Sequence, residues 1–186
     1  MATAPTKLIT VDEFEQMSFE GPCDLVDGEI VEQPMPGGIH GGVCVNIAFL
    51  LKLWVRDAAE EFWIGSNDVY ILIETDPDRV RGADVMAIRK SRIEGGRLPL
   101  GTLRVPPDLC VEVTSPTDRW TGIHEKVAEY IRIGVKEVWV ADVSERQVHV
   151  YRENRAPFIL TIGDELRSDE VLPGFTCPVE EIFAGV

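Results

Sequence analysis

The chain has 186 residues, of which 45% are hydrophobic and 27% are charged, and its formal net charge is −14. This length and composition are typical of one globular domain that buries enough apolar surface to fold without disulfides or a structural metal. The acidic balance argues against a broad basic surface for nucleic acid, although a local basic groove or an acidic site that recruits a divalent cation would be compatible with it.

The opening residues and the cysteines lead us to expect a cytoplasmic protein. The opening residues, MATAPTKLIT, contain no apolar segment of the kind that signal peptides have. The four cysteines form no C-x-x-C pair, and most fall in expected strands or a helix, where cysteine usually serves as a small buried hydrophobe. We therefore expect neither a disulfide framework nor a zinc site, and reduced thiols fit a cytoplasmic location.

The first elements are signalled by capping and turn residues. Thr10 and Glu13 have the spacing of a capping box, which predicts a short helix. The segment CDLVDGEIVEQ predicts a β-hairpin, because Asp27 and Gly28 form a strong two-residue turn signal between two strands.

A long helix should follow PMPGG, from about residue 41 to residue 60. It is apolar on nearly all sides, so we expect a central, buried helix. Asn46 and Lys52 interrupt the apolar run, which is also too short to predict a membrane span.

The second half alternates strands and helices. EFWIG, DVYILIE and ADVMAIR predict three short strands, and DLCVEVTS reads as a strand covered on both faces. A helix over about 122–133, stopped by Gly134, separates DLCVEVTS from KEVWVADV, so these two strands should be parallel. RQVHVYRE and FILTIG predict further strands.

The order of these elements predicts a mixed α/β fold, with a mixed central sheet flanked by helices, an N-terminal helix and a β-hairpin. We expect a single domain over residues 1–186, with a core of about 20–155 and C-terminal strands and a tail over 156–186.

Two carboxylates lie in segments that should be apolar. Glu112 lies in the middle of the DLCVEVTS strand, on the face that carries Cys110 and Thr114, and Asp84 opens the ADVMAIR strand. On neighbouring strands they would repel each other unless a cation shared them, and Mg²⁺ prefers such oxygen ligands. Taken singly, Glu112 could instead form a salt bridge or lie half in water, and Asp84 could simply start a strand.

Lysine and histidine side chains could complete a site. Lys126 borders the apolar stripe of the 122–133 helix, so its ammonium could either reach Glu112 or lie in solvent. His40, at the start of the long helix, could be a capping group, a donor to phosphate, a base or an ordinary loop residue. His124 could approach the same site, while the hairpin carboxylates Glu29 and Glu32 are expected in solvent.

Other chemistries have no motif in this sequence. G-x-S-x-G, Walker A and G-x-G-x-x-G patterns are absent. GGIHGG is rich in glycine but lacks the preceding buried strand and the lysine of a phosphate-binding loop.

Three segments together resemble a known family. CDLVDGEIVEQPMPGGIHGGV, RGADVMAI and PDLCVEVTSPTDRWTGIHEKVAEYIRIGVKEVWVADVSERQVHVYR resemble the Uma-type restriction endonucleases, long catalogued as a domain of unknown function. That family is placed in the PD-(D/E)XK nuclease superfamily. The resemblance covers roughly residues 10–180, and the PDLCVEVTSP…GVKEVWVAD block is its most specific part.

The resemblance implies a restriction-endonuclease-like fold and a metal-dependent DNA endonuclease. It implies that Asp84 and Glu112 hold Mg²⁺ or Mn²⁺ and that a lysine assists. The superfamily motif would place that lysine at Thr114, so Lys126 on the following helix is expected to replace it, and Ala83 stands where the family usually has proline. His40 is the fourth expected catalytic residue.

Two other functions remain open from the sequence. One is a non-catalytic interaction or regulatory protein, and the other is a metal-dependent hydrolase of a small phosphorylated molecule, which would suit the acidic charge. In each case we expect a homodimer and no membrane association.

Overall fold

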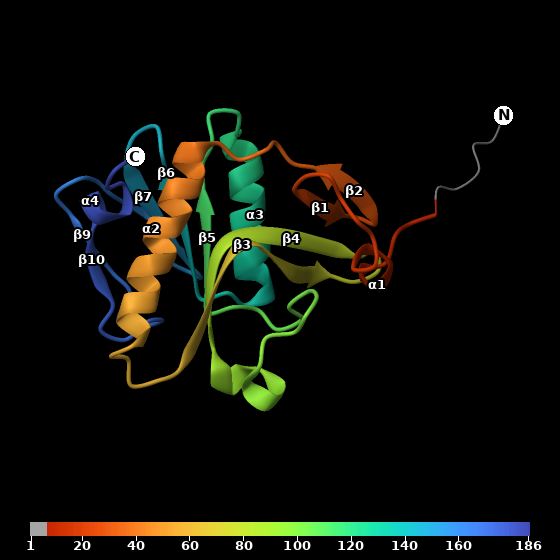
Figure 1. Ribbon diagram of the computed structural model, residues 1–186, viewed down its shortest axis with the longest axis horizontal. Coiled ribbons are helices and arrows are strands. Elements are labelled where there is room, and N and C mark those ends of the chain that lie inside the picture. The colour runs from red at the N-terminus through yellow and green to blue at the C-terminus, as the bar shows by residue number, and fades with distance from the viewer. Residues whose placement is uncertain (1–6) are drawn as a thin grey trace.

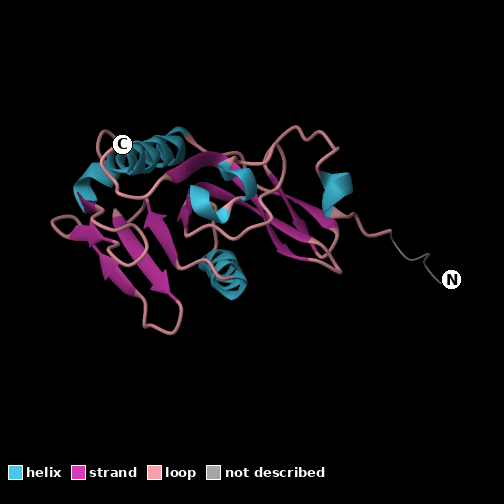
Figure 2. Ribbon diagram, turned by 90° about the horizontal axis from the view of Figure 1, so that it is seen from below, coloured by secondary structure: helices cyan, strands magenta, loops and turns pink. Residues whose placement is uncertain are grey.

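The computed structural model describes residues 7–186. The opening segment, in which we expect no signal peptide, therefore lies partly outside the described residues. An eight-stranded sheet has α2 on one face and α3 on the other (Figures 1 and 2). The predicted mixed α/β fold, with a mixed sheet flanked by helices, is confirmed.

The elements follow the chain in two groups. The N-terminal group contains α1 (Val11–Phe14), β1 (Cys23–Val26), β2 (Glu29–Glu32), α2 (Gly38–Val55), β3 (Phe62–Glu74), β4 (Arg79–Arg89) and two short 3₁₀ turns at Lys90–Arg92 and Glu94–Gly96. The C-terminal group contains β5 (Leu109–Val113), α3 (Trp120–Ile133), β6 (Glu137–Asp142), β7 (Gln147–Arg152), β8 (Phe158–Leu160), β9 (Glu165–Arg167), β10 (Thr176–Pro178) and α4 (Val179–Ile182).

Strand β4 organises the sheet, whose order is β2-β1-β4-β5-β6-β7-β8, with β3 also paired to β4. Strand β3 occupies one edge of β4 along nearly its whole length. The other edge is divided, because β1 pairs with it at Val80 and β5 pairs with it over 85–87. Residues 81–84 therefore lie where β1 and β5 separate, and the sheet is open there.

Local sequence signals explain several of these elements. The Thr10–Glu13 capping box is present at the start of α1. Asp27 and Gly28 both have positive φ, 52° and 75°, as a tight hairpin turn between antiparallel strands requires. The predicted parallel pairing of β5 and β6 across α3 is confirmed, and Gly134 ends α3 in the left-handed conformation.

The long helix differs from its prediction in bounds and in burial. It runs over 38–55, and it packs only one side on the sheet, through residues such as Val43, Ile47 and Leu51. Val45 and Phe49 on the opposite side are 67% and 63% exposed, so the expectation of a helix buried on all sides is wrong. Apolar composition does not by itself determine burial.

Among the described residues, α2 is the one helix long and apolar enough to cross a membrane, by length and composition alone.

Two of the three short strands predicted over residues 61–89 are one continuous strand. EFWIG and DVYILIE both belong to β3, which continues through a β-bulge between Ser66 and Val69. Asn67 and Asp68, at the bulge, have positive φ of 74° and 53°. The polar segment between the two apolar runs was interpreted as a turn, whereas the pairing with β4 resumes beyond it.

Separate hydrophobic clusters cover the two faces of the sheet. The α2 side combines inward residues of α2 and β5 with side chains of the C-terminal segment, including Leu166, Leu172 and Phe183. The α3 side combines Val127 and Tyr130 of α3 with strand residues. The opening beside β4 therefore lies between two well-packed layers, which hold its side chains in place.

Candidate active site

A polar cavity of about 80 Å³ lies where β1 and β5 separate along β4. This volume has room for several water molecules. The charged and imidazole side chains that line it and concern its chemistry are Asp24, His40, Asp68, Asp84, Glu112 and Lys126. Carboxylates outnumber the basic groups, so the cavity favours a bound cation.

Glu112 is buried, with 6% of its surface exposed, and both its oxygens have hydrogen-bond partners. Lys126 Nζ donates to its Oε2 at 2.9 Å, and Tyr130 Oη donates to its Oε1 at 2.8 Å. Burial raises the pKa of Glu112 to about 7; the Lys126 ammonium opposes this shift, and nearby Asp84 adds to it. The anomalous carboxylate of β5 is thus held by two side chains of α3.

Lys126 lies against Glu112 instead of extending into solvent. Burial disfavours its ammonium, but the charge and hydrogen bond of Glu112 outweigh that effect and raise the pKa of Lys126. The residue therefore remains a cation within the cavity. Thr114, where the superfamily motif would have its lysine, has a structural contact instead, since its Oγ1 accepts a hydrogen bond from the Val143 N–H at 3.0 Å.

Asp84 lies at the end of the ladder between β4 and β5. The last backbone pair there is Val85 with Val111, so one further step of the register brings Asp84 opposite Glu112. Asp84 Oδ2 accepts the backbone N–H of Val113 at 2.6 Å, and its Oδ1 lies 3.3 Å from His40 Nε2. Both carboxylates line the same cavity, so they do not lie on opposite sides of the sheet.

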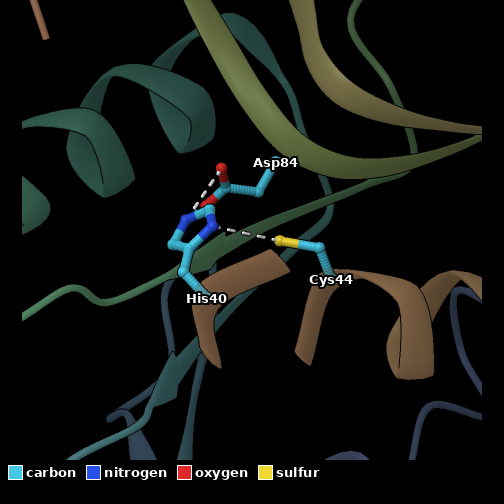
Figure 3. A group of neighbouring side chains, drawn as sticks. All are labelled: His40, Cys44 and Asp84. Carbon is cyan, nitrogen blue, oxygen red and sulfur yellow. Dashed lines mark hydrogen bonds and ion pairs between the residues drawn. The ribbon is translucent and has the colours of Figure 1, made fainter. Parts of the chain in front are cut away.

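His40 projects from the first turn of α2 toward Asp84 (Figure 3). Its Nδ1 lies 3.6 Å from Cys44 Sγ, one helical turn further along. Hydrogen bonds with Asp84 and Cys44 raise the pKa of His40 to about 10. In this arrangement the ring faces the Asp84 carboxylate as a donor, which favours the phosphate-facing role over that of a base.

Asp24 and Asp68, which line the cavity, and Cys44, which lies beside it, were not predicted as site residues from the sequence. Asp24 of β1 accepts hydrogen bonds from the Gly82 N–H, from Gln33 Nε2 and from Arg81. Asp68 reaches the cavity from the β3 bulge, and Cys44 lies behind His40. Asp24, like Glu112, is an acidic residue in an apolar strand, so the same reasoning could have identified it. The bulge that places Asp68 has no clear signal in the sequence.

Other candidates lie elsewhere. His124 does not line the cavity; its ring lies 5.5 Å from that of Trp120 and 6.1 Å from that of Tyr151, so the expectation that it approaches the site is wrong. It is wrong because His124 and Lys126, two positions apart, point to different sides of a helix. Glu29 and Glu32 of β2 are exposed, as expected.

Residues 11–180 match the Uma2 family, whose description is "Putative restriction endonuclease". A crystal structure from Anabaena variabilis, described as a putative nuclease belonging to DUF820, matches with a TM-score of 0.79 and 20% identity, over 95% of this chain and 98% of that chain. At that identity the likeness shows a shared fold. No match was found among the curated proteins. The resemblance first seen in the sequence is confirmed by the family match, which spans nearly the whole chain.

Proposed function

From the premise that the chain belongs to the Uma2 putative restriction endonuclease family, we propose that it is a metal-dependent endonuclease that hydrolyses phosphodiester bonds in DNA. Mg²⁺ or Mn²⁺ is held by Asp84 and Glu112, and Lys126 assists. The observation that carries this proposal is that Asp84, Glu112 and Lys126, distant in sequence, line one cavity.

The donor set fits such an ion. Mg²⁺ and Mn²⁺ prefer carboxylate oxygens and water, and the cavity has both carboxylates and room for water. Each oxygen of Glu112 has one hydrogen-bond donor, as has Asp84 Oδ2, so acceptor positions remain on both side chains. Asp24 accepts hydrogen bonds from Gly82, Gln33 and Arg81, so it has fewer free acceptor positions than Asp84 or Glu112.

Side chains of this chain orient the reacting groups. When bound, Mg²⁺ supplies the polarisation that activates a water and stabilises negative charge on the phosphate. Tyr130 fixes the Glu112 carboxylate by its hydrogen bond. Lys126, which stays cationic next to Glu112, can donate to the attacking water or to a phosphate oxygen in the transition state. His40, as a donor on the far side of Asp84, can contact the phosphate.

A cleavage assay tests this proposal. Supercoiled plasmid, linear duplex and single-stranded DNA are incubated with the purified protein in Mg²⁺ or Mn²⁺ and in excess chelator. We expect cleavage with metal only, and its loss in Glu112→Ala but not in Glu29→Ala, a matched control for an exposed carboxylate. Cleavage that survives in Glu112→Ala would show that the site lies elsewhere.

A second candidate function is favoured by charge. The net charge of −14 and the small, acidic cavity suit a small phosphorylated substrate better than a long polyanion. Hydrolysis of bis(p-nitrophenyl) phosphate or p-nitrophenyl phosphate that requires Glu112, without cleavage of any DNA, would favour this hydrolase. If no substrate is turned over and no metal raises the melting temperature, the non-catalytic interaction protein is the better account.

A further inference from the structure

His40 and Cys44 form a pair of potential metal ligands that do not hold the ion of the proposed carboxylate site; without a second ion, His40 is the phosphate donor described above. They are four residues apart in α2, so one face of the helix carries both. Figure 3 shows the imidazole of His40 between the Cys44 thiol, which points toward the ring, and the carboxylate of the β4 residue Asp84. One ligand atom from each of the three residues lies within 4.8 Å of the other two.

We propose that His40, Cys44 and Asp84 bind a divalent transition metal ion, of the class of Zn²⁺ or Co²⁺, at a site that adjoins the carboxylate pair and shares Asp84 with it. The donors are one imidazole nitrogen, one sulfur and one carboxylate oxygen. Thiolate and imidazole donors select transition metals, while Mg²⁺ prefers oxygen alone. The chemistry of this trio therefore differs from that of Asp84 with Glu112.

The separations already approach those of a coordinated ion. Ligand bonds of about 2.0–2.3 Å in a tetrahedral site place donors roughly 3.4–3.8 Å apart. His40 Nε2 lies 3.3 Å from Asp84 Oδ1, and His40 Nδ1 lies 3.6 Å from Cys44 Sγ. One nitrogen must serve the ion, and with one donor atom from each residue the three lie within 4.8 Å of one another, so the side chains must close by roughly 1 Å to coordinate it.

Three protein ligands would leave a fourth position open, as in catalytic zinc sites. His40 and Asp84 line the cavity, so that position would face the space where a phosphate ester is proposed to bind. Cys44 lies behind them, 9% exposed and packed in the hydrophobic cluster under α2. The ion would thus be anchored on the core side and accessible on the cavity side.

The same three residues could be read as a nucleophilic cysteine with its histidine and aspartate. Reactive cysteines are accessible and have a lowered pKa. Cys44 is buried, it lies in the second turn of its helix and not at the N-terminus, and burial raises the pKa of its thiol. These features suit a ligand, because metal coordination deprotonates a thiol that is otherwise inert.

Cobalt spectroscopy tests the site directly. Co²⁺ is added to the reduced, metal-free full-length protein, and the near-ultraviolet charge-transfer band of a cobalt–thiolate bond is recorded. We expect the band in the wild-type protein and in Cys23→Ser, because Cys23 is an equally buried cysteine beside the same cavity. We expect no band in Cys44→Ser, and Zn²⁺ binding by competition titration weakened at least about 100-fold.

Further variants separate this inference from the proposed nuclease function, with which it shares Asp84. Glu112→Gln should lose cleavage and keep the cobalt–thiolate band. His40→Gln should keep the fold, shown by its circular dichroism, and bind Zn²⁺ at least about 100-fold more weakly; it replaces Cys44→Ser if that variant does not fold. No band in the wild-type protein, a band that persists in Cys44→Ser, or Zn²⁺ affinity unchanged in His40→Gln would each overturn the site. A band that also requires Glu112 would contradict a separate site.

Discussion

Glu112 can lie in an apolar strand because both its oxygens have donors. Lys126 and Tyr130, four residues apart on α3, donate to one oxygen each. A buried carboxylate without such partners would be destabilising by several kcal/mol. This arrangement also means that removal of Lys126 affects both the charge of the cavity and the position of Glu112.

Replacement of Lys126 should therefore reduce activity. We expect Lys126→Met to lower the rate of metal-dependent DNA cleavage at least about 100-fold, because the transition state loses its cationic donor. Plasmid nicking under saturating Mg²⁺ measures this rate. Lys136→Met is the matched control, since Lys136 is exposed and does not line the cavity, and it should cleave as the wild-type protein does. Equal loss in both variants would refute a specific role.

The β3 bulge lies close to Gly82 of β4. A Cβ at this buried position would lie 3.2 Å from Asp68 Cβ. We expect Gly82→Ala to lower the free energy of unfolding by about 1–3 kcal/mol, measured by urea denaturation. Gly122→Ala in α3, where a Cβ would meet nothing within 4 Å, should be neutral or stabilising. A neutral Gly82→Ala would show that the bulge moves freely.

The sequence allowed part of the site to be predicted. Glu112 and Asp84 could be identified because an acid in an apolar strand is costly, and Lys126 because helical spacing directs it toward the sheet. Cys44 was interpreted as a small hydrophobe, which is what its burial shows, and its nearness to Asp84 depends on how α2 packs on β4. Asp68 depends on a bulge, so only the folded chain identifies it.

At the scale of elements, buried ion pairs join α3 to the sheet. Glu129 of α3 accepts hydrogen bonds from Arg79 and from Arg81, with Arg81 Nε 2.7 Å from Glu129 Oε2. Arg81 also donates to Asp24 of β1 at 3.1 Å. The network thus fixes β1, β4 and α3 to one another, and these elements carry much of the cavity.

This network predicts a pH dependence of stability. Burial alone would raise the pKa of Glu129, but the hydrogen bonds and charges of Arg81 and Arg79 outweigh it and lower the pKa below its ordinary value of 4.5. Because the folded pKa is the lower one, the stabilisation is complete above pH 4.5 and is lost as pH falls through the folded pKa. We expect Glu129→Gln to cost about 3 kcal/mol at pH 7, and this difference should shrink as the pH is lowered.

Urea unfolding from pH 7 down to pH 3.5 measures that difference. Glu125→Gln is the control, since Glu125 is 57% exposed in the same network and should contribute at most about 1 kcal/mol. A cost for Glu129→Gln that stays constant with pH would contradict the ion-pair explanation.

Local sequence signals predicted the individual helices, strands and turns better than they predicted how these elements continue and pack against one another. The capping box, the Asp27–Gly28 turn and Gly134 identified α1, the hairpin and the end of α3, because each feature acts within a few residues. The merging of two predicted strands into β3 and the one-sided burial of α2 depend on contacts with distant segments. Such contacts leave little trace in the local pattern.

For the whole molecule, the exposed side of α2 is a candidate interface for the homodimer that we expect from the sequence. Val45, Phe49 and Leu53 are 67%, 63% and 40% exposed and have the spacing of one helix face. If a second copy covers this face, Phe49→Glu should convert a dimer to a monomer in sedimentation equilibrium. Ile159→Glu on β8, where the side chain is 52% exposed, should leave the dimer intact. A wild-type protein that is monomeric at about 100 µM would contradict the expectation.

The acidic charge of the whole molecule and the proposed metal site are compatible, because a bound ion, together with Lys126 and His40, would supply positive charge at the phosphate. The central claim is that Asp84 and Glu112 share a divalent ion. The most direct measurement is the anomalous diffraction of Mn²⁺ in crystals of the wild-type protein. We expect a peak in the cavity about 2.0–2.4 Å from an oxygen of each carboxylate. An empty cavity at saturating Mn²⁺, or an ion bound without both carboxylates, would contradict it.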